Sequence, residues 1–353
     1  RENNIKKYID VKVAIAGYGV LGKVRHTTPP HFTCFDVVAI SDLLIEDFEI
    51  DDTISTYKNY VEMLDDPKLL YDVVFVCLTN NFNSKATIHA LNKNAHVFCE
   101  KPPGKNIQDI LDVLEVEKNH PNQKLMYGFN HRYHGSIIEA NRIIQSQELG
   151  KVINLRGVYG KSSLITFNQS AWRTKREIAG GGVLLDQGIH MVDMIRLFAG
   201  EFDEVYSFVE NSFWKHDVED NAYALMRSQD GKVAMLNSSA TQWRHRFNLD
   251  ITLEKGSIIL SGIISGSRSY GAETITIVTA DPENDGGSPE ETTTKYNTDS
   301  SWYLEIENFA NFVMSDEKVS SSTSVDALNT MKLVHQIYYA DKRWRKKAKI
   351  KKT

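Results

Sequence analysis

A glycine-rich turn near the start of this 353-residue chain constrains its fold more than any other feature. Residues 11–16 form an almost wholly apolar run, which predicts a strand covered on both faces. The turn that follows has the pattern G-x-G-x-x-G and consists of Gly17, Tyr18, Gly19, Val20, Leu21 and Gly22. Such a turn bends tightly at its first glycine, admits a ligand at its second and lets a helix pack on the strand at its third. The pattern therefore predicts an anion site at a helix N-terminus.

A carboxylate follows the next predicted strand, at residues 35–40. Asp42 lies about 20 residues beyond the last glycine of the turn, where dinucleotide sites place the acid that binds the adenosine ribose. A carboxylate there repels the 2′-phosphate of NADP, and the next residues, Leu43 and Leu44, offer that phosphate no cation. We therefore expect NAD rather than NADP. A glycine turn that holds no ligand is the alternative.

The first third of the chain alternates apolar runs with helical segments. Strands are predicted at 11–16, 35–40, 72–78, 96–99 and 124–128, and helices at 83–92 and 107–117. This alternation is typical of a doubly wound α/β fold. We predict an NAD-binding Rossmann domain over residues 1–128.

The pattern changes from residue 129 onward. A helix is predicted at 134–147, a strand at 151–159 and a helix at 180–198, and the strands predicted next are 205–209, 222–226, 233–238, 249–253 and 274–279. An exposed loop at 281–291 and helices at 302–314 and 325–344 complete the prediction. We predict an α+β domain with a large, mostly antiparallel sheet over residues 129–353, which binds substrate and forms a homodimer or homotetramer.

The composition excludes several classes of protein. The formal net charge of −5 provides no basic field for nucleic acid, and 41% hydrophobic with 25% charged residues is ordinary for a globular chain. No apolar stretch approaches the roughly 18 residues of a membrane span, and the N-terminal residues do not resemble a signal peptide. We expect a cytoplasmic protein with neither a nucleic-acid nor a membrane partner.

Two clusters carry candidate chemistry. Glu100 and Lys101 follow a predicted strand, and ligands bind outside the carboxyl ends of such strands; a surface lysine in a loop is the alternative. Asp186, His190 and Asp193 are spaced to share one face of a predicted helix that follows three glycines. Because ionisable groups on an apolar helix are costly when buried, this spacing favours an acid–base role. A metal site would need a second histidine that the sequence does not place, so no metal is expected.

These motifs together resemble the Gfo/Idh/MocA family, which includes glucose–fructose oxidoreductase and inositol dehydrogenase. The resemblance covers nearly the whole chain. It is carried by the glycine turn, Glu100-Lys101-Pro102, Asn130 with Arg132, and the block 181–193. It implies hydride transfer by Lys101, Asp186 and His190: His190 takes the hydroxyl proton, Lys101 binds that oxygen, and Asp186 holds the sugar.

The resemblance also implies cofactor contacts after the strand at 72–78. The residues concerned are Leu78, Thr79, Asn80 and Asn83, together with Glu100 and Lys101. The family usually has Thr-Pro-x-x-x-His in this stretch, whereas this chain has Thr79 in place of the proline and Asn83 in place of the histidine. We therefore expect altered contacts to the nicotinamide ribose.

Basic and aromatic residues gather in the second half. By the resemblance and by position, the substrate-binding residues are expected to be Lys101, Asn130, Arg132, Trp172, Arg173, Asp186 and His190. Trp172 and Arg173, like the later run 243–246, suit a sugar that bears phosphate or carboxylate, although ordinary surface charge is equally open. We predict an NAD-dependent dehydrogenase that oxidises a ring hydroxyl, with C3 as one candidate, of a sugar or nucleotide-sugar. The alternatives are an NAD-dependent glycoside hydrolase and a cofactor-sensing regulator, and the presence of Lys101 and His190 disfavours the regulator.

Overall fold

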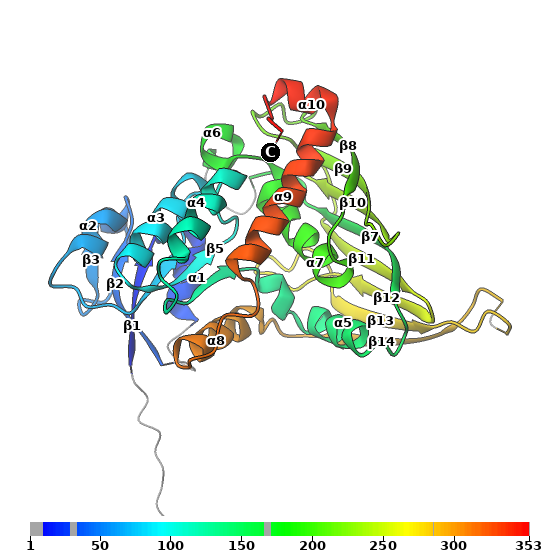
Figure 1. Ribbon diagram of the computed structural model, residues 1–353, viewed down its shortest axis with the longest axis horizontal. Coiled ribbons are helices and arrows are strands. Elements are labelled where there is room, and N and C mark those ends of the chain that lie inside the picture. Colours follow the sequence, from blue (N-terminus) through cyan, green and yellow to red (C-terminus); the bar gives the residue numbers. More distant parts are fainter. Residues whose placement is uncertain (1–9, 29–33, 166–170, 285, 353) are drawn as a thin grey trace, which may run out of the picture. The chain divides into compact units, whose positions relative to one another are not determined.

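The chain divides into two compact units in a computed structural model that describes residues 10–28, 34–165, 171–284 and 286–352 (Figure 1). The first unit comprises 1–104, 108–128 and 302–327, and the second comprises 105–107, 129–301 and 328–353. The predicted division assigned everything after residue 128 to the second domain, so the return of 302–327 to the first unit is a difference from that prediction.

A six-stranded parallel sheet forms the core of the first unit, in the order β3-β2-β1-β4-β5-β6. The strands are β1 (Val11–Ala16), β2 (Phe35–Ser41), β3 (Ser55–Tyr57), β4 (Val73–Val76), β5 (His96–Glu100) and β6 (Leu125–Gly128). The sequence did not predict β3, which has only three residues and lies at the sheet edge. The chain runs outward from β1 to β3 and then crosses to β4, so the direction of winding reverses between β1 and β4. Open sheets bind ligands at this switch point.

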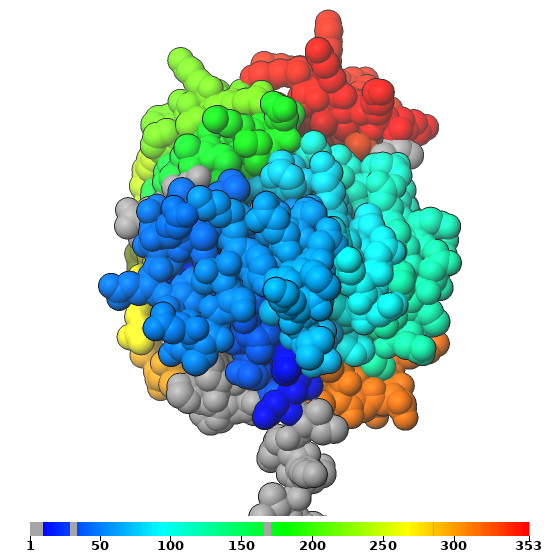
Figure 2. Space-filling model, turned by 90° about the vertical axis from the view of Figure 1, so that its left-hand side faces the viewer, coloured from blue at the N-terminus to red at the C-terminus, as the bar shows by residue number. Residues whose placement is uncertain are grey.

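Helices cover this sheet, and one of them comes from the far end of the chain. The helices are α1 (Val20–Thr27), α2 (Tyr60–Asp65), α3 (Asn80–Asn92), α4 (Ile107–Glu117) and α8 (Ser301–Val313). On the face shown in Figure 2, segments of this unit coloured blue to cyan are visible together with the orange segment that carries α8. Phe309 of α8 is fully buried, with its ring centroid 6.0 Å from that of Phe35 and 5.5 Å from that of Phe98. These aromatic contacts explain why residues 302–327 belong to the first unit.

A buried cluster of charges joins three elements of the first unit. Arg25 of α1 has no exposed surface. Its Nε donates to Oε1 of Glu100 and its Nη2 donates to Oε2 of Glu305, each at a distance of 2.6 Å. Burial by itself lowers the pKa of Arg25, but the two carboxylates outweigh it and raise that pKa. The guanidinium also lies over the rings of Phe98 and Trp302, 4.5 Å and 4.7 Å from their centroids. The cluster therefore links α1, β5 and α8.

Replacing Arg25 with methionine should destabilise the first unit by about 3–5 kcal/mol, because two buried carboxylates lose their counter-charge. Urea unfolding followed by far-UV circular dichroism measures this loss. Lys68→Met, at an exposed lysine of the first unit, is the matched control and should change stability by less than about 0.5 kcal/mol. Equal stability of the two variants would contradict the role assigned to the cluster.

The second unit contains an eight-stranded sheet in the order β14-β13-β12-β11-β7-β10-β9-β8. Its strands are β7 (Val152–Gly160), β8 (Glu204–Glu210), β9 (Asn221–Arg227), β10 (Val233–Ser239), β11 (Arg246–Leu253), β12 (Gly256–Ser261), β13 (Glu273–Thr279) and β14 (Glu290–Tyr296). All neighbours are antiparallel except β7 and β10, so the predicted mostly antiparallel sheet is confirmed. The sequence did not predict β12 or β14. The loop was predicted to extend through residue 291, but β14 begins at Glu290. The prediction failed here because this polar, exposed strand has no apolar periodicity.

Helices pack on one face of the eight-stranded sheet (Figure 1). They include α5 (Gly135–Ser146), α7 (Ile189–Ala199) and α9 (Ser324–Ala340), and the short helices α6 (Arg176–Ala179) and α10 (Lys342–Lys347) complete the unit. The single closing helix predicted over 325–344 is wrong, because Asp341 ends α9 and caps α10 by accepting from the backbone N–H groups of Arg343 and Trp344. Within the described ranges, no helix combines the length and apolar character needed to cross a membrane.

Candidate functional site

The predicted residues of the first unit lie at the carboxyl edge of its parallel sheet. The glycine turn follows β1, Asp42 follows β2, Thr79 comes shortly after β4, and Lys101 directly follows β5. Because the strands are parallel, their carboxyl ends meet at one edge, on either side of the switch point between β1 and β4.

The glycine turn has the geometry that a pyrophosphate requires. Gly17 has a φ of +94°, and a Cβ there would lie 2.4 Å from the carbonyl oxygen of Cys77. A Cβ at Gly22 would lie 2.0 Å from the carbonyl oxygen of Gly17, whereas a Cβ at Gly19 would meet nothing within 4 Å. Helix α1 starts without a side-chain cap and without an acidic residue in its first turn. Its N-terminal N–H groups and the open space at Gly19 therefore fit a bound dinucleotide.

Asp42 lies against the glycine turn. Its Oδ2 accepts from the backbone N–H of Tyr18 at 2.7 Å, and its Oδ1 accepts from that of Leu44 at 2.9 Å. The carboxylate is therefore held beside the turn, where the adenosine ribose of a dinucleotide lies in this fold. Leu43 and Leu44 are 81% and 60% exposed and present no charge to a 2′-phosphate.

Gly19→Ala and Gly22→Ala should have different effects. Gly19→Ala should leave thermal stability unchanged and weaken NADH binding at least tenfold, because its methyl group occupies space that the pyrophosphate needs. Gly22→Ala should lower both stability and binding, because its methyl group collides with the backbone. NADH fluorescence titration and thermal unfolding without cofactor measure the two effects. Wild-type affinity in Gly19→Ala would contradict this assignment of the phosphate site.

Asn83, which stands where the family has histidine, is tied to the loop that carries Lys101. Its Nδ2 donates to the carbonyl oxygen of Pro102 at 2.9 Å, and the peptide bond between Lys101 and Pro102 is cis. The amide thus connects α3 to this loop. Glu100 was expected to contact the cofactor; its side chain is instead directed into the protein, toward Arg25. Glu100 therefore anchors the start of the loop that carries Lys101 to helix α1.

Asp186 of the second unit lies between two cations. Its Oδ2 accepts from Lys161 Nζ at 3.0 Å and its Oδ1 accepts from Arg173 Nε at 3.2 Å. The guanidinium of Arg173 also lies 4.5 Å from the centre of the Trp172 ring. Two residues predicted to bind substrate, Trp172 and Arg173, thus belong to one group with Asp186. Part of the segment that precedes them, residues 166–170, lies outside the described residues.

His190 stacks on a second histidine. The ring centroids of His190 and His131 are 3.7 Å apart with an interplanar angle of 15°. The His131 ring nitrogens are 3.0 Å from the Tyr159 hydroxyl and 3.2 Å from Oδ1 of Asn130. Asn130 also donates to Ser301 at 3.2 Å. These contacts fix the His131 ring, and the stacking in turn fixes the plane of His190.

The block in which Asp186, His190 and Asp193 are expected to share one helical face contains a π-helical turn. The predicted helix 180–198 is interrupted, because residues Leu184–Gly188 form a π-helical turn before α7 begins. Asp186 lies in this turn and accepts from Lys161, whereas Asp193 of α7 accepts from both Nε and Nη2 of Arg132, each at 2.7 Å. Arg132, which is expected to bind substrate, binds Asp193 through its guanidinium fork.

A buried carboxylate holds the start of the π-helical turn. Glu219 accepts from the backbone N–H groups of Gly182 and Leu184 at 2.8 Å and 3.0 Å, and from the Tyr338 hydroxyl at 2.7 Å. Burial raises the pKa of Glu219, although these three donors act in the opposite direction. A Cβ at Gly182 would lie 2.1 Å from the carbonyl oxygen of Glu219, so the close approach requires glycine.

Sequence reasoning missed Lys161, His131 and Glu219. His131 stands between Asn130 and Arg132, both of which were singled out, so its position was a usable signal. Lys161 and Glu219 lie at strand ends or in loops, and no spacing connects them to residues 182–190. Among the described residues, no group of three or more histidine, cysteine or acidic side chains is arranged to hold a metal ion.

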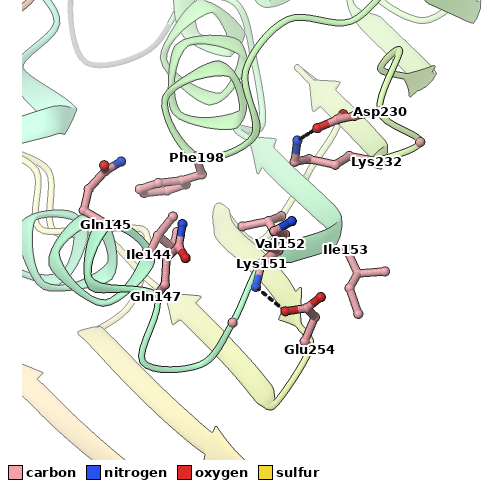
Figure 3. A pocket seen from close by; sticks show the side chains of 12 residues that line it. Ile144, Gln145, Gln147, Lys151, Val152, Ile153, Phe198, Asp230, Lys232 and Glu254 are labelled. Atoms are coloured by element: carbon pink, nitrogen blue, oxygen red, sulfur yellow. Dashed lines mark hydrogen bonds and ion pairs between the residues drawn. The ribbon is translucent and has the colours of Figure 1, made fainter.

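The described residues of the second unit line two cavities of about 580 Å³ each. One lies at the start of β7, the opposite end of that strand from Lys161, and is lined by the end of α5 and the turn 230–232 (Figure 3). Lys232 pairs with Asp230 there, and Glu254 accepts from the backbone N–H of Lys151 at 2.9 Å (Figure 3). This cavity is therefore a poor candidate for the substrate site.

The fold and these residues define a two-domain, NAD-binding oxidoreductase. The model of the oxidoreductase family with an NAD-binding Rossmann fold matches residues 11–129, and that of the GFO/IDH/MocA C-terminal domain matches 137–259. The chain belongs to the Gfo/Idh/MocA family.

Several known proteins are similar to this chain. Myo-inositol 2-dehydrogenase of Thermotoga maritima is 27% identical over 289 residues, which cover 79% of this chain and 80% of that protein. D-glucoside 3-dehydrogenase of Escherichia coli is 26% identical over 65% of this chain and 70% of its own length. The structure of levoglucosan dehydrogenase in complex with NADH and L-sorbose has a TM-score of 0.80 at 19% identity and covers 95% of this chain and 97% of its own, which shows a shared fold.

Proposed function

We propose that the protein is an NAD-dependent dehydrogenase that oxidises a ring hydroxyl of a sugar or nucleotide-sugar, with C3 as one candidate position. The observation that carries this proposal is the open glycine turn with Asp42 beside it, at the same sheet edge as Lys101. The names of similar proteins support the reaction, since they include an inositol 2-dehydrogenase and a glucoside 3-dehydrogenase.

The chain supplies acid–base and binding groups, and bound NAD supplies the hydride acceptor. His190 accepts the hydroxyl proton as the substrate is oxidised, in an orientation set by its stack on His131. Lys101 donates a hydrogen bond to the same oxygen and stabilises its developing negative charge. Asp186, held by Lys161 and Arg173, accepts hydrogen bonds from other hydroxyls of the sugar.

Lys101→Ala and His190→Ala should each lower kcat at least about 100-fold, because each removes a group that acts on the reacting hydroxyl. NADH binding should persist in both. Rates of NADH formation and NADH fluorescence titration measure these effects, and Lys118→Ala and His120→Ala, away from the proposed site, are matched controls. Near-normal turnover in either site variant would remove that residue from the catalytic group.

Net release of NADH distinguishes the proposed dehydrogenase from the alternative, an NAD-dependent glycoside hydrolase of the same family. A glycoside hydrolase that oxidises its substrate only transiently releases no net NADH, whereas a dehydrogenase releases NADH with the oxidised sugar. The relatives named above are dehydrogenases, which favours the dehydrogenase. A screen of free sugars and UDP-sugars for NADH formation, with identification of the oxidised carbon, decides the substrate.

We also propose a cytoplasmic location. Cys34, Cys77 and Cys99 are all free thiols, as is usual in a reducing compartment. Fractionation of cells that express the protein tests this proposal.

A second copy of the chain is the proposed partner for an apolar patch on the second unit. The patch lies on the sheet face opposite α5 and α7 and consists of Tyr206, Phe208, Tyr223, Leu225 and Met235. Phe208 and Tyr223 are paired across β8 and β9 and are 77% and 53% exposed. Exposed apolar patches of this kind mark interfaces, and a twofold axis lets such a patch meet its own copy. We propose a homodimer through this face, or a homotetramer if a second surface also associates.

Phe208→Glu should convert the assembly to a monomer, because it places a charge within the apolar patch. Sedimentation velocity measures the mass. Leu43→Glu, at an 81% exposed apolar residue of the first unit, is the control and should leave the mass unchanged. A monomeric wild-type protein, or an unchanged mass for Phe208→Glu, would overturn this interface.

A further inference from the structure

The second cavity of the second unit is basic, and the roles proposed above do not use it. Its volume is about 580 Å³, and it is lined by the start of β11, the end of β12 and the loop 268–272. Arg244, Arg246 and Arg268 lie on its wall with His245. No aspartate or glutamate is among the described residues that line it. This concentration of positive charge contrasts with the formal net charge of −5 for the whole chain.

The wall of this cavity is ordered by a chain of hydroxyl groups. The ring nitrogens of His245 are 3.0 Å from Ser162 Oγ and 2.8 Å from Ser269 Oγ. Ser269 in turn contacts Ser267 Oγ at 2.7 Å, next to Arg268. Burial and, to a smaller extent, the Lys161 ammonium lower the pKa of His245, so the arginines supply the positive charge of the cavity near neutral pH. The segment that carries Arg268 is thus held in place before any ligand arrives.

Contacts within the second unit connect this cavity to Asp186. Gln187, the next residue after Asp186, donates to the hydroxyl of Tyr270, which lines the cavity, at 3.0 Å. On the other side, the backbone N–H of Gln242 donates to the carbonyl oxygen of Lys161 at 3.0 Å, and Lys161 binds Asp186. Tyr270 and Gln242, which line the cavity, are therefore bonded directly to Gln187 and Lys161, the residues next to Asp186 in sequence or in contact with it.

We propose that the basic cavity binds a phosphoryl group of the substrate, so that the preferred substrate is a phosphorylated sugar rather than a neutral one. This inference rests on the proposed sugar dehydrogenase activity. Guanidinium groups match phosphoryl oxygens in pairs of hydrogen bonds. Three arginines line this cavity, and no carboxylate residue is among its described lining. The phosphoryl group can belong to a sugar monophosphate or to the diphosphate of a nucleotide-sugar.

The kinetic test compares one sugar in four forms: free, as its monophosphate, as its UDP derivative and as its uronic acid. We expect the wild-type protein to favour one phosphorylated form over the free sugar at least tenfold in kcat/KM. Arg244→Gln, Arg246→Gln or Arg268→Gln should each reduce this preference at least fivefold, mainly through KM. Arg343→Gln, at an exposed arginine of α10, is the matched control and should keep the preference. The form that is preferred separates a monophosphate from a nucleotide diphosphate.

A binding test separates failure of this inference from failure of the proposed function. Calorimetry with NADH-saturated protein, titrated with inorganic phosphate and with UDP, needs no turnover. If phosphate or UDP binds to the wild-type protein and this binding is lost in the arginine variants, the basic cavity is supported as a phosphoryl-binding site, even if no sugar is oxidised. Oxidation of the free sugar and its phosphate with equal kcat/KM would overturn the inference and leave the dehydrogenase intact. A preference for the uronic acid alone, or phosphate binding that the variants do not change, would also overturn it.

Discussion

Arg25 carries a positive charge where water does not reach it, and its two carboxylate partners come from distant parts of the chain. A buried charge is tolerated only when it is paired, so this contact fixes three elements together. Helix α1 presents its N-terminus to the phosphate site, Glu100 immediately precedes Lys101, and Glu305 belongs to α8. One ion cluster therefore couples the helix proposed to bind the dinucleotide with the loop proposed to act on the substrate. It also explains why a helix beyond residue 300 belongs to the first unit.

Charge matching organises the second unit in the same way. Asp186 lies between Lys161 and Arg173, Asp193 is bound by the fork of Arg132, and the donors around Glu219 are two backbone N–H groups and one hydroxyl. Each carboxylate near the π-helical turn has its own donors, and this fixes the turn that carries Asp186 and leads to His190. The basic cavity departs from this rule, since no carboxylate lines it. The basic cavity therefore differs from the surroundings of these carboxylates, because the described residues that line it bring no opposite charge to its arginines.

Much of the fold could be predicted because it depends on local patterns. The buried strands of the parallel sheet are continuous apolar runs, and the helices that pack on them show helical spacing. The failures have physical causes. β3 is too short to show a pattern, and β14 is exposed on both faces. The π-helical turn at 184–188 has the composition of an ordinary helix, so the sequence did not reveal it.

The sequence by itself determined the glycine turn, the carboxylate at Asp42 and the five longer strands of the first unit, because these follow from backbone conformation and from residues close together in the chain. Only the tertiary structure decided which charges meet. Glu305 pairs with Arg25, Lys161 pairs with Asp186, and His131 stacks on His190, since long-range packing sets each of these contacts and no local spacing encodes them. The same packing brought Arg244 and Arg268 to one cavity from separate segments of the chain.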